Sequence, residues 1–202
     1  MLETLKSLLI TFSLGSDWHA IEVEWLKQLN LSRFIPFDPF FQFISNSVSY
    51  VAWGIPLLLL VIGLFRKQSN LHWNFLFVWI SVLLASLVTL TLKYLILRPR
   101  PFESYEFIEK LSTGGSPSFP SGHTTDAFAF AVALILAYPR WYVILPSLVW
   151  AIMVGYSRMS LGVHYPSDVL FGIIIGSASA YLCYRLSVYF STRSKLSARN
   201  NT

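Results

Sequence analysis

Three short motifs in the middle of the chain combine basic residues, two histidines and one acid. In order they are Lys93-x6-Arg100-Pro101, Pro120-Ser121-Gly122-His123 and Ser157-Arg158-x5-His164-x3-Asp168. Each motif lies near the end of an apolar run. Basic side chains bind phosphoryl oxygens, and arginine offers two parallel hydrogen bonds. The motifs therefore suit chemistry on a phosphate, and the neighbouring apolar runs indicate the phosphate of a lipid.

The three cations of these motifs are candidates for phosphate binding. Lys93, Arg100 and Arg158 can each supply fixed positive charge to phosphoryl oxygens. The alternative for each is a cation that snorkels from the end of a membrane helix. Arg98 competes with Arg100 for the same role, because each of these arginines precedes a proline.

Ser121 and Gly122 lie where a proline-rich segment leads into an apolar run. Glycine lets a backbone come close to a ligand, and the free N–H groups of a first helical turn bind anions. Ser121 can also cap that turn. An ordinary helix start explains the same residues, so this motif alone is a weak signal.

The two histidines have different neighbours. His164 lies two residues before Pro166, and proline fits the first position of a helix. Asp168 then falls in the first turn, where the helix dipole favours an acid. It can reach back to His164 and fix the ring tautomer, which leaves the other nitrogen free to attack. His123 can donate a proton to a leaving group. Asp126 either favours the helix start or modulates His123.

The composition indicates an integral membrane protein of one domain, 1–202. The chain is 54% hydrophobic and 12% charged, against about a quarter charged in soluble domains. The net charge of +5 does not indicate nucleic acid, because the basic residues form no contiguous run. Seven Trp and ten Tyr fit interfacial aromatic belts. The single cysteine, Cys183, excludes an internal disulfide and a Cys-rich metal site, and we expect it to be a small buried side chain.

The apolar runs predict an all-α, polytopic membrane bundle with about five transmembrane helices. The predicted spans are 39–65, 73–92, 127–139 (with 123–126 as its first turn), 141–157 and 169–184. The third run has only 13 residues, and its length alone favours a core or re-entrant helix. Gly172 and Gly176 have the spacing of a helix-packing face. Prolines and glycines predict a loop over 96–120.

Both ends of the chain differ from these spans. In the segment 1–37, Trp18, Ile21, Trp25 and Leu29 recur at helical spacing, which predicts an interfacial amphipathic helix. The tail 191–202 is polar and is predicted to be frayed.

Five spans place all three motifs, which lie within the stretch 93–168, on the same side of the membrane. The other side carries Arg66, Lys67, Arg140 and the basic tail. The Lys/Arg bias predicts a cytoplasmic C-terminus in a cell inner membrane, with the motifs facing outward.

Together, the three motifs resemble those of the type 2 phosphatidic acid phosphatase superfamily, which also includes vanadium haloperoxidases and glucose-6-phosphatase. The family pattern is met without substitution over 93–168, and the order of the helices extends the resemblance to most of the chain. A soluble haloperoxidase is excluded by hydropathy. The N-terminal region lacks the sixth span that many bacterial members have.

The resemblance implies a metal-independent lipid phosphatase with no cofactor. His164 would be the nucleophile that forms a phosphohistidine, Asp168 would orient it, and His123 would protonate the leaving oxygen. The implied phosphate-binding residues are Lys93, Arg100, Ser121, Gly122 and Arg158. The spacing of the family motif favours Arg100 over Arg98.

The substrate would be a phosphorylated lipid that enters from the bilayer. Undecaprenyl diphosphate is the first choice, with phosphatidylglycerophosphate, phosphatidate and a lipid A phosphate as alternatives. A transporter is a hypothesis of another class, but transporters place ionisable residues at the bilayer midplane. A non-catalytic interaction protein would be expected to lose a histidine, and both are present.

Overall fold

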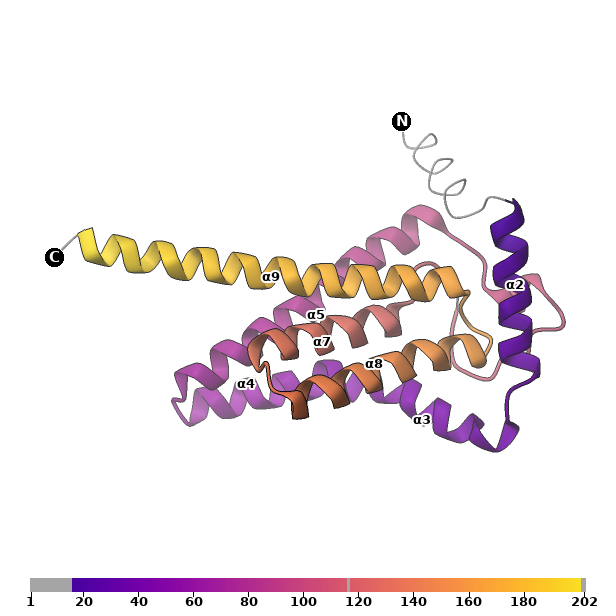
Figure 1. Cartoon of the computed structure of the whole chain (residues 1–202), viewed down its shortest axis with the longest axis horizontal. Coiled ribbons are helices and arrows are strands. Elements are labelled where there is room, and N and C mark those ends of the chain that lie inside the picture. Colours follow the sequence, from indigo (N-terminus) through magenta and orange to yellow (C-terminus); the bar gives the residue numbers. More distant parts are fainter. Residues whose placement is uncertain (1–15, 116, 201–202) are drawn as a thin grey trace.

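The computed structural model of the chain describes residues 16–115 and 117–200 and contains no strand within them. The helical segments are, in order, α2 (Ser16–Leu31), the 3₁₀ turn η1 (Ile35–Phe37), α3 (Asp38–Val48), the π-helix η2 (Ser49–Gly54), α4 (Ile55–Phe65), α5 (Ser69–Ile96), α6 (Pro101–Ser104), α7 (Gly122–Ala137), α8 (Trp141–Ser160) and α9 (Pro166–Asn200). The long helices run alongside one another as a bundle (Figure 1). The predicted all-α membrane bundle is confirmed.

Four helical stretches are long and apolar enough to cross a membrane. They are Ile35–Phe65, Asn70–Ser104, Trp141–Ser160 and Pro166–Phe190. These correspond to the first, second, fourth and fifth predicted spans, and α5 extends beyond the predicted 73–92 at both ends. The third predicted span is α7, which has 16 residues and is shorter than the roughly 20 that a spanning helix needs.

The position of α7 inside the bundle explains how so short an apolar helix is accommodated. It packs against α5, α8 and α9 (Figure 1). Its buried residues are mostly small, which allows the neighbouring helices to approach closely. Because other helices surround α7, most of its apolar surface meets protein instead of lipid.

Two glycines of α9 allow the closest of these approaches. A Cβ added at Gly172 would lie 2.9 Å from the carbonyl oxygen of Ser121. At Gly176 it would lie 2.4 Å from the carbonyl oxygen of Thr125, which would be a steric clash with the backbone. The predicted packing face of small residues is therefore confirmed, and it holds the start of α7 against the start of α9.

The described residues between α5 and α7 (97–115 and 117–121) are irregular, as predicted, except for one short helix. Leu97 ends α5 in a left-handed conformation with φ 52°, and Pro99 disfavours a helical conformation for Arg98. The one-turn helix α6 then begins at Pro101, where a proline suits the first helical position. The predicted loop over 96–120 therefore contains one helical turn.

Helix α2 lies across one end of the bundle (Figure 1). Trp18, Ile21 and Trp25 are exposed, as the predicted interfacial helix requires, whereas residues 1–15 of the predicted segment 1–37 lie outside the described residues. The opposite face of α2 is buried through Glu22, Leu26 and Asn30, recurring every fourth residue. A helix expected only to lie on the membrane therefore also packs against the protein.

The other end of the chain corrects a prediction. Helix α9 continues to Asn200, so the polar tail predicted to be frayed over 191–202 is helical as far as that residue, and 201–202 lie outside the described residues. No proline or glycine follows Gly176 to interrupt the helix.

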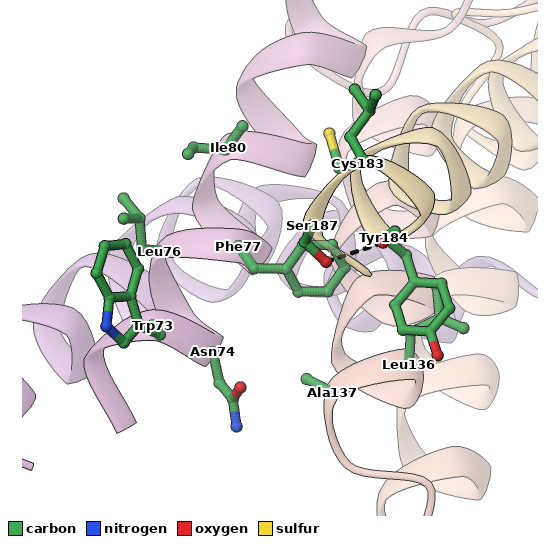
Figure 2. A pocket seen from close by; sticks show the side chains of 11 residues that line it. Trp73, Asn74, Leu76, Phe77, Ile80, Leu136, Ala137, Cys183, Tyr184 and Ser187 are labelled. Atoms are coloured by element: carbon green, nitrogen blue, oxygen red, sulfur yellow. Dashed lines mark hydrogen bonds between the residues drawn. The ribbon is translucent and has the colours of Figure 1, made fainter. Parts of the chain in front are cut away.

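A groove of about 990 Å³ opens between α5, α7 and α9 at the end of the bundle away from α2. Figure 2 shows Trp73 and Phe77 of α5, Leu136 of α7 and Cys183 of α9 along it. Cys183, predicted to be a small buried side chain, is half-buried there. The three motifs contribute no residue to this groove, and the candidate site lies elsewhere.

Candidate active site

The ends of four helices bring the predicted site residues together at the end of the bundle near α2. Lys93 and Arg100 come from the end of α5 and the segment after it, Ser121, Gly122 and His123 from the start of α7, Arg158 from the last turn of α8, and His164 and Asp168 from the start of α9. The predicted convergence of the three motifs is therefore observed.

His164 and Asp168 form a buried pair. His164 Nδ1 lies 3.4 Å from Asp168 Oδ2, and the two side chains are 2% and 0% exposed. The same Oδ2 accepts hydrogen bonds from the Tyr165 backbone N–H at 2.9 Å and from Ser118 Oγ. As predicted, α9 begins at Pro166 with Asp168 in its first turn. The carboxylate thus reaches back to the histidine ring.

The structure separates the two competing arginines. Arg100 Nη1 lies 3.4 Å from His164 Nε2, and its Nε donates to the Gly115 carbonyl oxygen at 2.7 Å. Arg98 Nη1 instead donates to Asp168 Oδ1 at 2.8 Å. Arg100 therefore faces the free nitrogen of the ring, whereas Arg98 lies behind the carboxylate.

Arg158 is 1% exposed, and one of its side-chain nitrogens makes no hydrogen bond within the described residues. Its two terminal nitrogens donate to the Ser45 and Ser112 hydroxyls and to the Thr113 carbonyl oxygen. Its Nε is buried and has no hydrogen-bond partner in the described part of the chain. A buried donor without a partner is costly, so this nitrogen is suited to an anionic ligand.

Lys93 is anchored by the loop that precedes α7. Its Nζ donates to the carbonyl oxygen of Pro117 at 2.6 Å. The side chain is half-buried, like Gly122 and His123, whereas the other five predicted site residues are buried. His123 lies within electrostatic reach of Lys93 and the two site arginines. The site is therefore open on the side where α5 ends and α7 begins.

The start of α7 provides backbone donors. Ser121 occupies the predicted cap position, but its side chain makes no capping hydrogen bond, so that part of the prediction is wrong. Its Oγ bonds to Thr124 Oγ1 at 2.9 Å, and its N–H donates to the Asp168 carbonyl oxygen at 3.0 Å. Without a side-chain cap, the first N–H groups of α7 can receive an anion.

Asp126 has a structural setting. It accepts a hydrogen bond from Trp53 Nε1 at 2.9 Å on one oxygen and one from Ser86 Oγ on the other. These bonds join α7 to η2 and α5. They favour a packing role for Asp126 over the alternative that it modulates His123.

Three residues that the motifs did not single out for a role also surround the pair: Glu22, Ser118 and Ser167. Glu22 belongs to α2 and is 0% exposed. In the sequence, its four-residue spacing from Leu26 and Asn30 could have indicated that Glu22 shares their buried face, but a glutamate on an amphipathic helix is ordinarily solvated. Within 16–115 and 117–200, no three His, Cys, Asp or Glu side chains are placed to hold a metal ion.

Burial keeps His164 neutral. Desolvation, together with the charges of Arg158 and Arg100, lowers the pKa of His164 to about 3, although Asp168 acts in the opposite direction. At neutral pH the ring therefore carries one proton. The contact with Asp168 favours placing it on Nδ1, which leaves the Nε2 lone pair on the side of the cations.

The fold and the site define a multi-pass helical membrane protein whose basic, histidine-containing site lies at one end of its bundle. Residues 73–191 match the PAP2 superfamily, and the chain belongs to this family. It is 28% identical to the undecaprenyl-diphosphatase of Sulfolobus acidocaldarius, over 92% of this chain and 88% of that protein.

Two further relatives share the fold or the sequence. The lipid A 4'-phosphatase of Bacteroides thetaiotaomicron is 28% identical, over 85% of this chain and 82% of that protein. The crystal structure of a PAP2-type phosphatidylglycerolphosphate phosphatase from Bacillus subtilis superimposes with a TM-score of 0.74 and 25% identity, covering 93% of this chain and 94% of that one. The family and these relatives identify the chain as a membrane lipid phosphatase.

We expect His164 to remain neutral from about pH 5 to about pH 8, where an ordinary histidine titrates. Its folded-state pKa of about 3 lies below the reference value of 6.5. As the pH falls, the unfolded chain therefore takes up this proton at a higher pH than the folded protein does. The contribution of neutral His164 to the free energy of unfolding is complete above about pH 6.5 and is lost as the pH falls toward 3. Imidazole ¹⁵N shifts of the histidine-labelled protein in detergent measure this directly. A His164 signal that titrates near pH 6.5 would contradict it.

Proposed function

We propose that the chain removes a phosphate from a membrane lipid through a phosphohistidine on His164, with undecaprenyl diphosphate as the first-choice substrate. The observation that carries this proposal is the orientation of the His164 imidazole ring. Its Nδ1 faces Asp168, and its Nε2 faces Arg100. A nucleophile oriented by an acid and aimed at a cluster of cations suits attack on a phosphoryl group.

In the first step, Nε2 of His164 attacks phosphorus, and the bond from phosphorus to the leaving oxygen breaks. His123 donates a proton to that oxygen as it leaves. In the second step, a water molecule loses a proton to His123 and attacks the same phosphorus. The phosphorus–nitrogen bond then breaks and releases phosphate, with both histidines returned to their initial states.

The residues around the histidines would hold the phosphoryl oxygens. Arg158 offers its unpaired Nε, Lys93 and Arg100 offer charge, and Ser121 with the Gly122 N–H offers hydrogen bonds at the start of α7. A phosphoryl group between Nε2 and Arg100 would accept the hydrogen bond of that arginine. Nε2 would then be free to attack. The cations would counter the developing charge without a metal ion.

The choice of substrate is supported by the relatives. Undecaprenyl diphosphate is the substrate named for the Sulfolobus relative, which aligns with 92% of this chain. A lipid A phosphate and phosphatidylglycerophosphate are the alternatives suggested by the other two relatives, and phosphatidate remains an alternative from the family resemblance. The lipid would enter from the bilayer at the open side of the site, where Leu90, Tyr94 and Leu97 are exposed.

A panel of lipids tests both the substrate and the metal independence. In detergent with excess EDTA, we expect phosphate release from undecaprenyl diphosphate to exceed that from phosphatidylglycerophosphate, phosphatidate and lipid A by at least about tenfold in kcat/KM, which is about 1.4 kcal/mol of discrimination. A different preferred lipid would replace the first choice. Activity that appears only after a divalent ion is added would contradict the metal-independent mechanism.

Substitution of each histidine tests its role. His164→Ala should lower kcat by roughly 10³-fold or more, because no phosphoenzyme can form. His123→Ala should lower it by about 10²- to 10⁴-fold for a lipid, yet still form phosphoenzyme from an aryl phosphate whose leaving group needs no proton. Acid quenching with ³²P-labelled substrate traps the intermediate, and His72→Ala, at the other end of α5, is the matched control. An active His164→Ala enzyme would exclude His164 as the nucleophile.

The site would face outward from an inner membrane, with the C-terminus in the cytoplasm. Arg66, Lys67 and Arg140 follow or precede helices at the end of the bundle away from the site, where the Lys/Arg bias favours the cytoplasm. In a Cys183→Ala background, a membrane-impermeant maleimide should label Glu106→Cys in intact cells and Arg140→Cys only after the cells are opened. The reverse pattern would invert the topology.

A further inference from the structure

Glu22 is a fully buried acid that the proposed reaction does not use. It projects from α2, the helix that lies across the site end of the bundle (Figure 1). Its Oε1 accepts a hydrogen bond from Arg98 Nη2. Its Oε2 accepts from Ser167 Oγ at 2.5 Å and from the Ser167 backbone N–H at 3.3 Å. Glu22 therefore binds both the segment after α5 and the first turn of α9.

Arg98 connects Glu22 to the catalytic pair. Its Nη1 donates to Asp168 Oδ1 and to Ser167 Oγ, each at 2.8 Å. Its guanidinium carbon lies 3.8 Å from the centre of the Tyr165 ring. With Oδ1 held by Arg98, the other oxygen of Asp168 is directed toward His164. The contacts run without interruption from Glu22 through Arg98 and Asp168 to the nucleophile.

The buried network of Glu22, Arg98 and Asp168 is stable only when each charge has its partner. Arg98 is 8% exposed, and Glu22 and Asp168 are 0% exposed. Removal of one partner from a buried ion pair leaves an uncompensated charge, which the structure relieves by rearrangement or by admitting water. Without Glu22, Asp168 would be the one acid still paired with the Arg98 guanidinium among the described residues. The guanidinium of Arg98 is then free to hydrogen-bond Asp168 Oδ2 as well as Oδ1, and Oδ2 is the oxygen that faces His164.

We propose that Glu22 is a positioning residue that acts through Arg98 to orient Asp168 and thereby His164, so that α2 is an integral part of the active site. The proposal rests on the assignment of His164 as nucleophile. The described hydrogen bonds of Glu22 go to His19, Arg98 and Ser167 and to none of the proposed phosphate-binding residues, so its effect should fall on the rate of the chemical step and leave lipid binding unchanged.

The outer side of Glu22 is also occupied. His19 Nδ1 lies 2.9 Å from Glu22 Oε1, and its Nε2 lies 3.0 Å from the Tyr105 hydroxyl. The groups around the acid are therefore Arg98 and Ser167 on the site side, and His19 with Tyr105 on the outer side. His19 is partly exposed and closes the network at the protein surface.

The test compares Glu22→Gln with Glu24→Gln, a glutamate of the same helix whose side chain is 56% exposed. Glu22→Gln should lower kcat by about 10- to 100-fold with KM changed less than about twofold, because a misplaced catalytic group slows the chemical step. Glu24→Gln should match the wild type. Wild-type kcat in Glu22→Gln, or a loss confined to KM, would overturn the proposal.

A double-mutant cycle with Arg98→Met separates positioning from general destabilisation. If Glu22 acts through Arg98, the double variant should be no slower than the slower single variant. Losses that multiply would mean that the two residues act independently and would overturn the proposal. Should Glu22→Gln not fold, Ser167→Ala removes the one hydroxyl that bonds to both Glu22 and Arg98 while leaving all the charges in place, and it should still lower kcat about threefold or more. An unchanged rate would overturn the network.

A readout independent of activity distinguishes this proposal from the proposed function. The ¹⁵N shifts of His164 should report an Nδ1–H tautomer in the wild type and a tautomer mixture in Glu22→Gln, with His123 unchanged. If the wild type hydrolysed none of the lipids, the proposed function would fail while this measurement still tested the network. Identical His164 shifts in the two proteins would overturn the positioning role.

Discussion

The buried carboxylate of Asp168 is the interaction on which the rest of the site depends. A carboxylate with 0% exposure requires compensation for its lost hydration, and it obtains this from Arg98 on one oxygen and from Ser118 and a backbone N–H on the other. The backbone carbonyl of the same residue accepts the N–H of Ser121. One residue at the start of α9 thus fixes the segment after α5, the loop before α7 and the start of α7 itself, with His164 between them.

The irregular loop over 111–115 and 117–120 solves a second problem, which is how to bury three cations without pairing each of them with an acid. Its carbonyl groups belong to no helix, so they can accept from side chains: Lys93 bonds to Pro117, Arg100 to Gly115 and Arg158 to Thr113. Carbonyl groups stabilise a cation without cancelling its charge. The three cations therefore keep a net positive field directed at the space beside His164, and under the proposed function this field would be present before a phosphate binds.

Much of the site could be predicted because its residues occur next to helix ends, and helix ends can be located from hydropathy. Each motif follows or precedes an apolar run, so the number of spans alone places His123 and His164 on one side. The roles of Arg98 and Arg100 could not be separated from local sequence, since each precedes a proline and only packing decides that they face opposite ends of the His164–Asp168 pair. Glu22 was missed for a similar reason. Its burial requires α2 to fold across helices that lie more than 70 residues away in the chain.

At four positions of α2, the polarity is the reverse of that of a surface helix in a soluble protein, and this reversal has a physical explanation. Trp18 and Trp25 point outward, while Glu22 and Asn30 point inward to hydrogen-bond the site segments. In water, such an arrangement would expose aromatic surface and bury polar groups at a cost. At a membrane interface the outward aromatic rings are favoured, and the inward polar groups meet a polar site rather than an apolar core. The same helix therefore presents aromatic rings on one face and hydrogen-bonds the candidate site with the other, so that under the proposed function attachment to the membrane and the order of the active site would be parts of one structure.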